Sequence, residues 1–298
     1  MAKKHKYTVI DLFAGCGGLS LGLYQAGWKG LFAIEKNDFA FATLKANLID
    51  NKKHFEWPKW LPQTPHDINE VLNNYESELL ALRGLVDLVA GGPPCQGFSM
   101  AGYRVVDDPR NSLYKEMKEI VEKIKPEFVV MENVEGLRSM LNGKVEEKIV
   151  EDYEKMGYKI NLAVLNSADY GVAQFRKRVI FICNRIGKTN FHPKPLFDES
   201  NYVTLGEAIE KYMYIDENKD INHEFTNHSE EMKKRLSEVP EGKSLYKNYS
   251  DSWKKSPWDK PSCTIKENHG ATNIHPKLPR GMTAREIATL QSFPEDPY

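Results

Sequence analysis

The chain has 298 residues, of which 41% are hydrophobic and 28% are charged, and its formal net charge is −1. This composition is ordinary for a folded soluble protein, and the net charge excludes a uniformly basic nucleic-acid binder of the histone type. No stretch approaches the apolar length that a bilayer span needs. The first apolar run, Tyr7–Asp11, is too short for the core of a signal peptide, so we expect a cytoplasmic protein.

The four cysteines lie far apart and show no paired C-x-x-C spacing. A disulfide framework and a zinc site are therefore not expected, and we predict no metal. Each of them must fill a core or perform chemistry: Cys16, Cys95, Cys183 and Cys263. We expect Cys183, inside a predicted strand, to be core.

The first 185 residues alternate short apolar runs with longer helical stretches. The expected strands are, in chain order, Tyr7–Asp11, Leu31–Ile34, Val86–Ala90, Phe128–Met131, Ile160–Leu165 and Val179–Cys183. The helical stretches between them include Gly18–Ala26, Phe39–Asn47, Ser112–Ile124 and Lys144–Met156. This alternation predicts an α/β fold with a parallel, doubly wound sheet, in which ligands bind at the carboxyl ends of the strands.

The composition changes after Arg185, where the chain becomes polar and rich in Asn, Lys and Tyr. We expect residues 1–185 to form the larger domain and residues 186–298 a smaller, loop-rich one. Helical character returns near the end of the chain, at Met282–Ser292, where Thr283 and Glu286 have the spacing of a capping box.

Basic residues are concentrated in the second half of the smaller domain. From Lys243 to Arg285 there are nine basic and three acidic residues, a local balance of +6. Such a stretch suits contacts with phosphates, and a merely solvated face fits the charge equally well.

A glycine-rich segment, Asp11-Leu-Phe-Ala-Gly-Cys-Gly-Gly18, follows the first strand and opens a helix. Its glycines let the backbone approach a ligand, and its amides are free at the helix start. Glu35 ends the second strand, where a carboxylate can accept both hydroxyls of a ribose, and Asp67 is suited to accept from an adenine amino group. Together they favour an adenosine-containing ligand, although each carboxylate alone is equally well explained as a helix cap or a solvated side chain.

A second group of residues indicates chemistry. Cys95 lies in the rigid segment Gly91-Gly-Pro-Pro-Cys-Gln-Gly-Phe-Ser99, at the carboxyl end of a strand, which favours a nucleophile over an inert core thiol. Glu132 ends the neighbouring strand and reaches the same edge. The extended segment Gln174-Phe-Arg-Lys-Arg178 places Gln174, Arg176 and Arg178 on one face, suited to a planar substrate edge or, alternatively, to guarding an exposed strand with charge.

These segments, in this order, resemble the motif set of the DNA (cytosine-5)-methyltransferase family. The resemblance rests on the glycine-rich segment, Gly92-Pro-Pro-Cys-Gln96, Glu132-Asn-Val134, Gln174-x-Arg-x-Arg178 and Thr283-x-Arg-Glu286 followed by Leu290-Gln-Ser-Phe-Pro294. It covers nearly the whole chain. It implies a Rossmann-like catalytic domain that uses S-adenosyl-L-methionine, a target-recognition domain over residues 186–298, and double-stranded DNA as the partner of a monomer.

The resemblance also assigns roles to residues. Cys95 is implied to add to carbon 6 of a flipped-out cytosine, with Glu132 donating to ring N3 and Arg178, supported by Arg176, binding the O2 edge. The residues implied to surround the cofactor are Phe13, Gly15, Cys16, Gly17, Glu35, Asp67, Pro93 and Leu113. Those expected at the DNA are Gln96, Ser99, Arg110 and Gln174, with Lys254, Lys255 and Lys260 from the basic stretch. One departure is Lys36, which stands where the family often has an aromatic residue.

Two rival functions use the same scaffold. An RNA methyltransferase of the tRNA-modifying branch carries a Cys-Phe-Thr segment, whereas this chain has only Cys263-Thr264. A DNA-binding relative without turnover would show damage at Cys95, Glu132 or Arg178, and all three are intact. The resemblance to the compact members of the family, which lack added regulatory domains, implies the modification half of a prokaryotic restriction–modification system.

Family members continue past the Leu290–Pro294 motif into a segment with a Gly-Asn-x-Val signature, which does not occur in this sequence. Truncation and a natural split, with a second chain supplying the segment, both explain this, and truncation is the interpretation that we favour. Either predicts weaker cofactor binding by this form than by a completed one.

Overall fold

The computed structural model describes residues 7–94, 112–247, 253–266 and 273–295. Contacts divide the chain into two compact units, which are taken separately below. Unit 1 comprises residues 1–164 and 178–192, and unit 2 comprises residues 165–177 and 193–298. Arg185, after which the composition changes, therefore lies within the second stretch of unit 1, residues 178–192, and not at a boundary between the units.

Unit 1 contains a six-stranded sheet with the order β2-β1-β3-β4-β6-β5. The strands are β1 (Thr8–Leu12), β2 (Lys29–Ile34), β3 (Leu88–Gly91), β4 (Phe128–Val134), β5 (Lys159–Asn166) and β6 (Lys177–Asn184). Each expected strand is present, and most extend one to three residues beyond the apolar run at one or both ends. The α/β doubly wound fold is confirmed.

One detail of the expected sheet is wrong. Strands β2, β1, β3 and β4 pair in parallel, but β6 runs antiparallel to β4, with Val134 opposite Arg178. Only residues 167–176 join β5 to β6, and a parallel crossover needs about a dozen residues or more. The short connection therefore forces the reversal, and the Gln174-x-Arg-x-Arg178 segment runs from its end into the start of β6.

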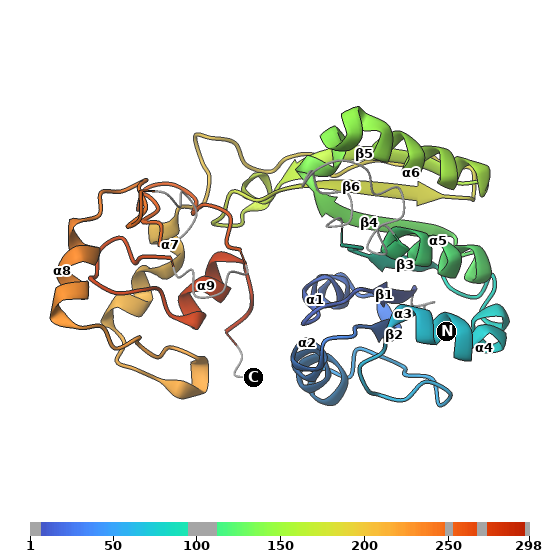
Figure 1. Ribbon diagram of the computed structural model, residues 1–298, viewed down its shortest axis with the longest axis horizontal. Helices are drawn as coiled ribbons and strands as arrows, with labels where there is room; N and C mark the ends of the chain where they lie inside the picture. The colour runs from blue at the N-terminus through green and yellow to red at the C-terminus, as the bar shows by residue number, and fades with distance from the viewer. Residues whose placement is uncertain (1–6, 95–111, 248–252, 267–272, 296–298) are drawn as a thin grey trace, which may run out of the picture. The chain divides into compact units, whose positions relative to one another are not determined.

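Helices cover both faces of the sheet (Figure 1). Those of unit 1 are α1 (Gly18–Gln25), α2 (Asp38–Leu44), the π-helix η1 (Lys45–Asn51), α3 (Ile68–Asn74), α4 (Glu76–Ala81), α5 (Ser112–Ile124), the 3₁₀ segment η4 (Glu135–Gly143) and α6 (Lys144–Lys155). The strand β1 shows how the faces separate: Val9 packs toward Leu23 of α1, whereas Ile10 and Leu12 join the core under α3–α6. This is the two-residue periodicity of a strand buried on both faces. Cys183 is buried in the same core, as expected.

Unit 2 has short helices and long connections. Its elements are η5 (Ser167–Tyr170), α7 (Leu205–Ile209), η6 (Glu210–Tyr214), η7 (Lys219–Ile221), α8 (Glu230–Glu238) and α9 (Ala284–Leu290). Its main core gathers apolar side chains from α7, η6 and α9. No helix among the described residues of either unit is long and apolar enough to cross a membrane.

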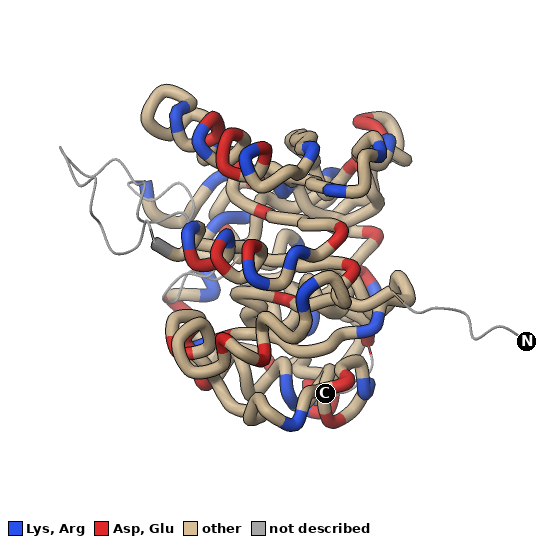
Figure 2. The backbone as a smooth tube through the Cα atoms, turned by 90° about the vertical axis from the view of Figure 1, so that its right-hand side faces the viewer, with Lys and Arg blue, Asp and Glu red and all other residues tan. Residues whose placement is uncertain are grey.

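Acidic and basic residues are intermingled over the described chain (Figure 2). On α5 and α6 they form a network in which Lys118 and Lys148 both pair with Asp152. Ion pairs whose lysines reach the surface in this way contribute little stability individually. Their arrangement gives unit 1 a mixed surface rather than a field of one sign.

Candidate active site

The glycine-rich turn between β1 and α1 adopts a backbone that few residue types allow. Gly15 and Gly17 have φ of +57° and +92°. A side chain at Gly17 would meet the Leu48 side chain at 2.7 Å, whereas one at Gly15 would have no neighbour within 4 Å. Packing against η1 thus explains Gly17, and open space next to the backbone distinguishes Gly15. Phe13 also has a φ of 57°, which is an outlier for a bulky residue and is found mainly at functional sites.

Glu35 fixes the geometry of this turn from the end of β2. Its Oε2 accepts the backbone N–H of Gly15 at 2.8 Å, and its Oε1 accepts that of Asn37 at 2.7 Å. Each carboxylate oxygen has two acceptor positions, so each keeps one for a ligand. Glu35 therefore supports the turn and still presents acceptors at the strand end.

Asp67 has the capping role that is one of the two interpretations left open by the sequence, and it also lines a cavity. It is the N-cap of α3, where its Oδ1 accepts the backbone N–H of Asn69 at 2.9 Å. Its Oδ2 lies 4.0 Å from the ammonium of Lys36. The capping role uses one oxygen and leaves the other facing the side chains of a cavity.

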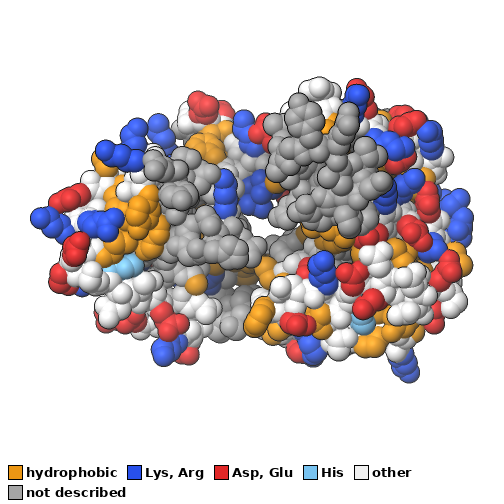
Figure 3. Space-filling model, viewed as in Figure 1, with side chains coloured by type: hydrophobic (Ala, Val, Ile, Leu, Met, Phe, Trp, Pro, Cys, Tyr) orange, Lys and Arg blue, Asp and Glu red, His pale blue; other side chains and the backbone are white. Residues whose placement is uncertain are grey.

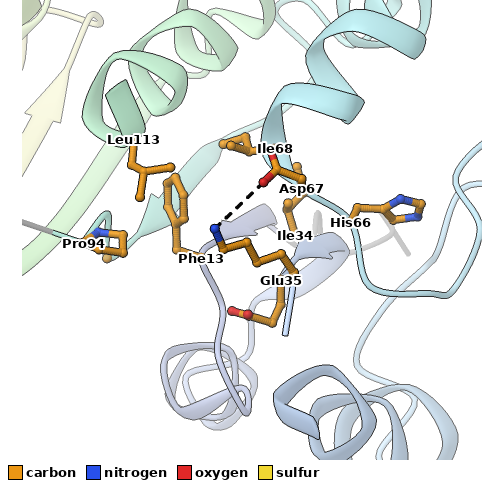
Figure 4. Close-up of a pocket in the computed structure, with 10 residues that line it drawn as sticks. Phe13, Ile34, Glu35, His66, Asp67, Ile68, Pro94 and Leu113 are labelled. Atoms are coloured by element: carbon orange, nitrogen blue, oxygen red, sulfur yellow. Dashed lines mark ion pairs between the residues drawn. The ribbon is translucent and has the colours of Figure 1, made fainter. Parts of the chain in front are cut away.

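That cavity lies at the carboxyl ends of β1, β2 and β3 (Figure 4). The Phe13 ring points toward Leu113 of α5, and the His66 ring points away from the others. The dashed line at Asp67 marks its ion pair with Lys36. The lining residues are Phe13, Ile34, Glu35, Lys36, His66, Asp67, Ile68, Gly92, Pro94 and Leu113. Four of the eight expected cofactor residues are therefore brought together, namely Phe13, Glu35, Asp67 and Leu113.

The other lining residues were not expected from the sequence. Ile34 and Ile68 stand next to the two carboxylates in the chain, so adjacency was the available signal. Cys16 and Pro93 are among the expected cofactor residues that do not line the cavity. Cys16 is exposed, and the carbonyl of Pro93 accepts a hydrogen bond from Asn133. Lys36, the departure from the family pattern, is part of the wall.

Asp11 lies beneath the turn and is almost completely buried. Ser20 donates to its Oδ2 at 2.5 Å, and its Oδ1 has no hydrogen-bond partner among the described residues. Burial raises the pKa of Asp11 to about 7, and the nearby Glu35 charge acts in the same direction. This carboxyl is therefore partly protonated near neutral pH.

The second group of expected residues meets at the ends of β3, β4 and β6. Arg178 Nε lies 2.8 Å from Glu132 Oε1, and the two side chains come from adjacent strands. Gly92 lies beside the same carboxylate, because a side chain there would come within 3.4 Å of Glu132 Oε2. Asn133 is buried and donates to the carbonyl of Pro93 at 2.9 Å.

Asn133 thereby ties the end of β3 to β4 two residues before Cys95. Sequence reasoning missed this role, although the position of Asn133 next to Glu132 in the motif was a signal. Cys95 itself, together with Gln96, Ser99 and Arg110, lies outside the described residues.

Gln174 and Arg176 are held by the backbone of unit 2. Gln174 is buried, and its Oε1 accepts the N–H of Ile265 at 3.0 Å. Arg176 donates to the Ile265 carbonyl at 3.4 Å. The two side chains thus clamp one residue of a neighbouring segment, which gives Gln174 a structural explanation beside the expected one at DNA.

The Thr283-x-Arg-Glu286 motif forms a buried hydrogen-bonded cluster at the start of α9. Thr283 and Glu286 make the expected capping box. Arg280 binds both oxygens of Glu286, at 2.7 and 2.8 Å. Burial of Glu286 opposes its ionisation, but the hydrogen bonds and charge of Arg280 outweigh burial and lower its pKa. Arg285 donates to the Pro294 carbonyl, so the motif is used internally.

The three lysines expected at DNA are placed differently from one another. Lys260 is exposed and Lys254 is half-buried. Lys255 is buried, and its ammonium donates to the Ser237 carbonyl at 3.2 Å, so this charge already has a protein partner. On the face drawn in Figure 3, Lys and Arg side chains of the described residues are scattered rather than gathered in one patch.

Comparison with known proteins decides the family. The model of the C-5 cytosine-specific DNA methylase family matches residues 7–298. This chain belongs to that family. The cytosine-5 DNA methyltransferase is 37% identical to the type II methyltransferase M1.HphI of Haemophilus parahaemolyticus, over 97% of this chain and 78% of that protein. It is 31% identical to M.DdeI of Desulfomicrobium norvegicum, over 97% of this chain and 79% of that protein.

Solved structures agree on the fold of this methyltransferase. A prophage-encoded DNA modification methyltransferase of E. coli superposes with a TM-score of 0.75 at 24% identity, covering 97% of this chain and 89% of the other. The S. pombe Dnmt2 methyltransferase superposes with a TM-score of 0.60 at 18% identity, covering 97% and 88%. The Rossmann-like architecture predicted from the strand–helix alternation is therefore confirmed.

Proposed function

We propose that this methyltransferase transfers a methyl group from S-adenosyl-L-methionine to carbon 5 of cytosine in a specific sequence of double-stranded DNA, with Cys95 as nucleophile. The observation that carries the proposal is the Glu132–Arg178 pair beside Gly92, joined to the segment that leads into Cys95 by the bond from Asn133 to Pro93. The cavity lined by Glu35 and Asp67 is also lined by Gly92, which lies beside Glu132, and by Pro94, which directly precedes Cys95.

The cavity fits the proposed cofactor. Glu35 keeps one acceptor position on each oxygen for the two ribose hydroxyls, and Asp67 keeps Oδ2 for the adenine amino group. Phe13 and Leu113 provide apolar contact for a purine, and Gly15 leaves room beside the backbone. Cys16 and Pro93, which do not line this cavity, are proposed to contact the cofactor beyond it, and Gly17 holds the turn. S-Adenosylmethionine, when bound, supplies a methyl group activated by its sulfonium.

The base needs activation because carbon 5 of cytosine is a weak nucleophile. Addition of the Cys95 thiolate to carbon 6 forms the Sγ–C6 bond and moves an electron pair to carbon 5. Carbon 5 then bonds the methyl group while the methyl–sulfur bond of the donor breaks and its electron pair stays on the departing sulfur. Removal of the carbon 5 proton by a base returns the electron pair to the ring and expels the thiolate. Water is the proposed base, because no described side chain is assigned that task.

Glu132 and Arg178 orient and polarise the base in this proposal. Glu132 Oε1 is engaged by Arg178, so Oε2, on the Gly92 side, is the oxygen left for ring N3 and the amino group. The Arg178 guanidinium binds the O2 edge, and its charge favours the thiolate form of Cys95. Arg176 supports this segment through its bond to Ile265.

DNA must present the target base outside the helix, because within the stack the thiolate cannot reach carbon 6 and the methyl donor cannot reach carbon 5. We place Gln96, Ser99 and Arg110 at the DNA, and Lys254 and Lys260 at its phosphates. Residues 186–298 are proposed to recognise the target sequence, with the protein acting as a monomer. The type II relatives suggest the modification half of a restriction–modification system.

The test is transfer of labelled methyl groups to plasmid DNA and, in parallel, to tRNA. We expect incorporation into DNA alone, lost in Cys95→Ala while cofactor and DNA binding persist. Bisulfite sequencing of the methylated plasmid then gives the ring position and the target sequence together. Incorporation into tRNA, or turnover by Cys95→Ala, would overturn the proposal.

A further inference from the structure

Glu116 is a buried carboxylate on α5 that the proposed chemistry does not use. It is only 6% exposed, and its Oε2 has no hydrogen-bond partner among the described residues. Its Oε1 accepts one bond, from Asn69 Nδ2 at 2.9 Å. A buried carboxylate with so few donors is costly to the fold, so its presence needs an explanation other than stability.

The explanation lies in what Asn69 binds at the same time. Asn69 Nδ2 also lies 3.2 Å from Asp67 Oδ1, and the Asn69 backbone N–H donates to the same oxygen. One amide group therefore stands between two carboxylates and supplies both with a donor. The two acceptors also fix which way the amide points, because its oxygen would be repelled by either.

The bridge links the two helices that flank the cavity. Asp67 and Asn69 lie at the start of α3, and Glu116 lies one turn after Leu113 on α5. Asp67 and Leu113 both line the cavity, whereas Glu116 and Asn69 do not. Holding Asp67 Oδ1 from behind leaves Oδ2, which lies 4.0 Å from the Lys36 ammonium, as the oxygen on the cavity side.

We infer that Asn69 and Glu116 are positioning residues that lock the Asp67 carboxylate for selection of a 6-aminopurine over a 6-oxopurine cofactor. This rests on the proposed function, in which Asp67 accepts from the adenine amino group. A 6-oxo group presents an acceptor to the same oxygen, so discrimination depends on Asp67 being unable to turn away. Release of the bridge leaves Asp67 Oδ1 held by the Asn69 backbone N–H alone, a single bond about which the carboxylate can turn.

The experiment measures the affinity ratio of S-adenosylhomocysteine to S-inosylhomocysteine by titration calorimetry. Glu116→Leu removes the bridge and replaces a buried charge with an apolar group, a change that folds commonly tolerate. We expect the ratio to fall about fivefold, equivalent to about 1 kcal/mol, mainly through weaker adenosyl binding. Asn69→Ala changes an exposed residue, removes the same bridge without disturbing the core, and lowers the ratio to a similar extent.

Two controls complete the design. Glu116→Gln keeps an acceptor for Asn69 and therefore retains the wild-type ratio within about twofold, less than the change expected when a hydrogen bond is removed. The double variant of Asn69→Ala and Glu116→Leu matches the single variants, because both changes break one bridge.

Asp67→Asn distinguishes the proposed contact of Asp67 with the adenine amino group from the positioning role of Asn69 and Glu116. If it lowers the ratio while Glu116→Leu and Asn69→Ala leave the ratio at the wild-type value, the positioning role is overturned and the role of Asp67 stands. If Asp67→Asn itself leaves the ratio unchanged, the proposed contact with the adenine amino group fails, and the positioning role fails with it.

Discussion

Glu35 and Glu286 are both glutamates of recognised motifs, and the structure uses them in opposite ways. Glu35 is half-buried, is bound by two backbone amides and keeps acceptor positions toward a cavity. Glu286 is fully buried, and its oxygens are taken by Arg280 and the cap of α9. Motif membership alone therefore does not say whether a residue meets a ligand. The acceptors that remain after internal hydrogen bonds are counted show which of the two carboxylates can still bind one.

The strongest way to break this comparison is Glu286→Gln. It leaves the Arg280 guanidinium buried without its counter-charge, which typically costs about 3–5 kcal/mol of folding stability. We expect a large drop in the midpoint of thermal unfolding, with cofactor affinity of the folded protein unchanged. The matched control is Glu207→Gln, in the exposed capping box of α7, which should hardly move the midpoint. Equal effects of the two substitutions would contradict a special role of the buried pair.

A second substitution probes the chemical end of unit 1. Glu132→Gln keeps the size of the side chain but removes the charge that pairs with Arg178 and the group that polarises the base. We expect kcat to fall about 10²–10³-fold, as for loss of one polarising group, with little change in folding stability. The control is Glu135→Gln, three residues along and exposed. A wild-type kcat for Glu132→Gln would remove Glu132 from the mechanism.

Glu35→Gln sharpens the comparison from the cofactor side. The glutamine amide keeps one oxygen, which can accept from Gly15 or from Asn37 but not from both. Its NH₂ group replaces the other oxygen and is a donor. We expect cofactor binding to weaken by about 1–3 kcal/mol, the range for hydrogen bonds to charged groups, as measured by calorimetric titration. Asp38→Asn, on the exposed first turn of α2, is the control. Loss of folding without a selective binding defect would mean that Glu35 acts only on the turn.

The smallest expected effect separates two lysines. Lys260→Glu should weaken binding to all DNA sequences and flatten the salt dependence, with a change in slope of about one for each phosphate that the protein no longer neutralises. Lys255→Met should leave DNA affinity unchanged, because the Lys255 ammonium is already bound to Ser237. An equal decrease of DNA affinity in both variants would mean that Lys255 contacts DNA as Lys260 does. An altered target sequence would show that Lys260 reads bases instead.

Sequence patterns predicted most of unit 1 because β1, β2 and β3 are short apolar runs buried on both faces. The runs around Ile10 and Val89 are fully buried, and helices follow them as expected. Strand direction at β6 was not predictable from apolar pattern alone, because periodicity is the same in parallel and antiparallel pairing. Only the short β5–β6 connection contained that information.

The site was predicted in part, for a similar reason. Glu35 and Asp67 stand at strand and helix boundaries that the sequence marks, so their convergence followed from topology. The burial of Lys255 and Gln174 depends on segments distant in sequence, Ser237 and Ile265, which no local pattern reveals. The same holds for the bridge from Glu116 to Asn69.

The most direct measurement of the central claim is the intact mass of the protein after reaction with DNA that carries 5-fluorocytosine at the mapped target position, in the presence of S-adenosylmethionine. Fluorine replaces the proton that must leave carbon 5, so the bond from the Cys95 sulfur to carbon 6 should persist. We predict a species equal to protein plus methylated strand, and none with Cys95→Ala. No adduct with the wild-type protein, or an adduct formed equally by Cys95→Ala, would contradict the account.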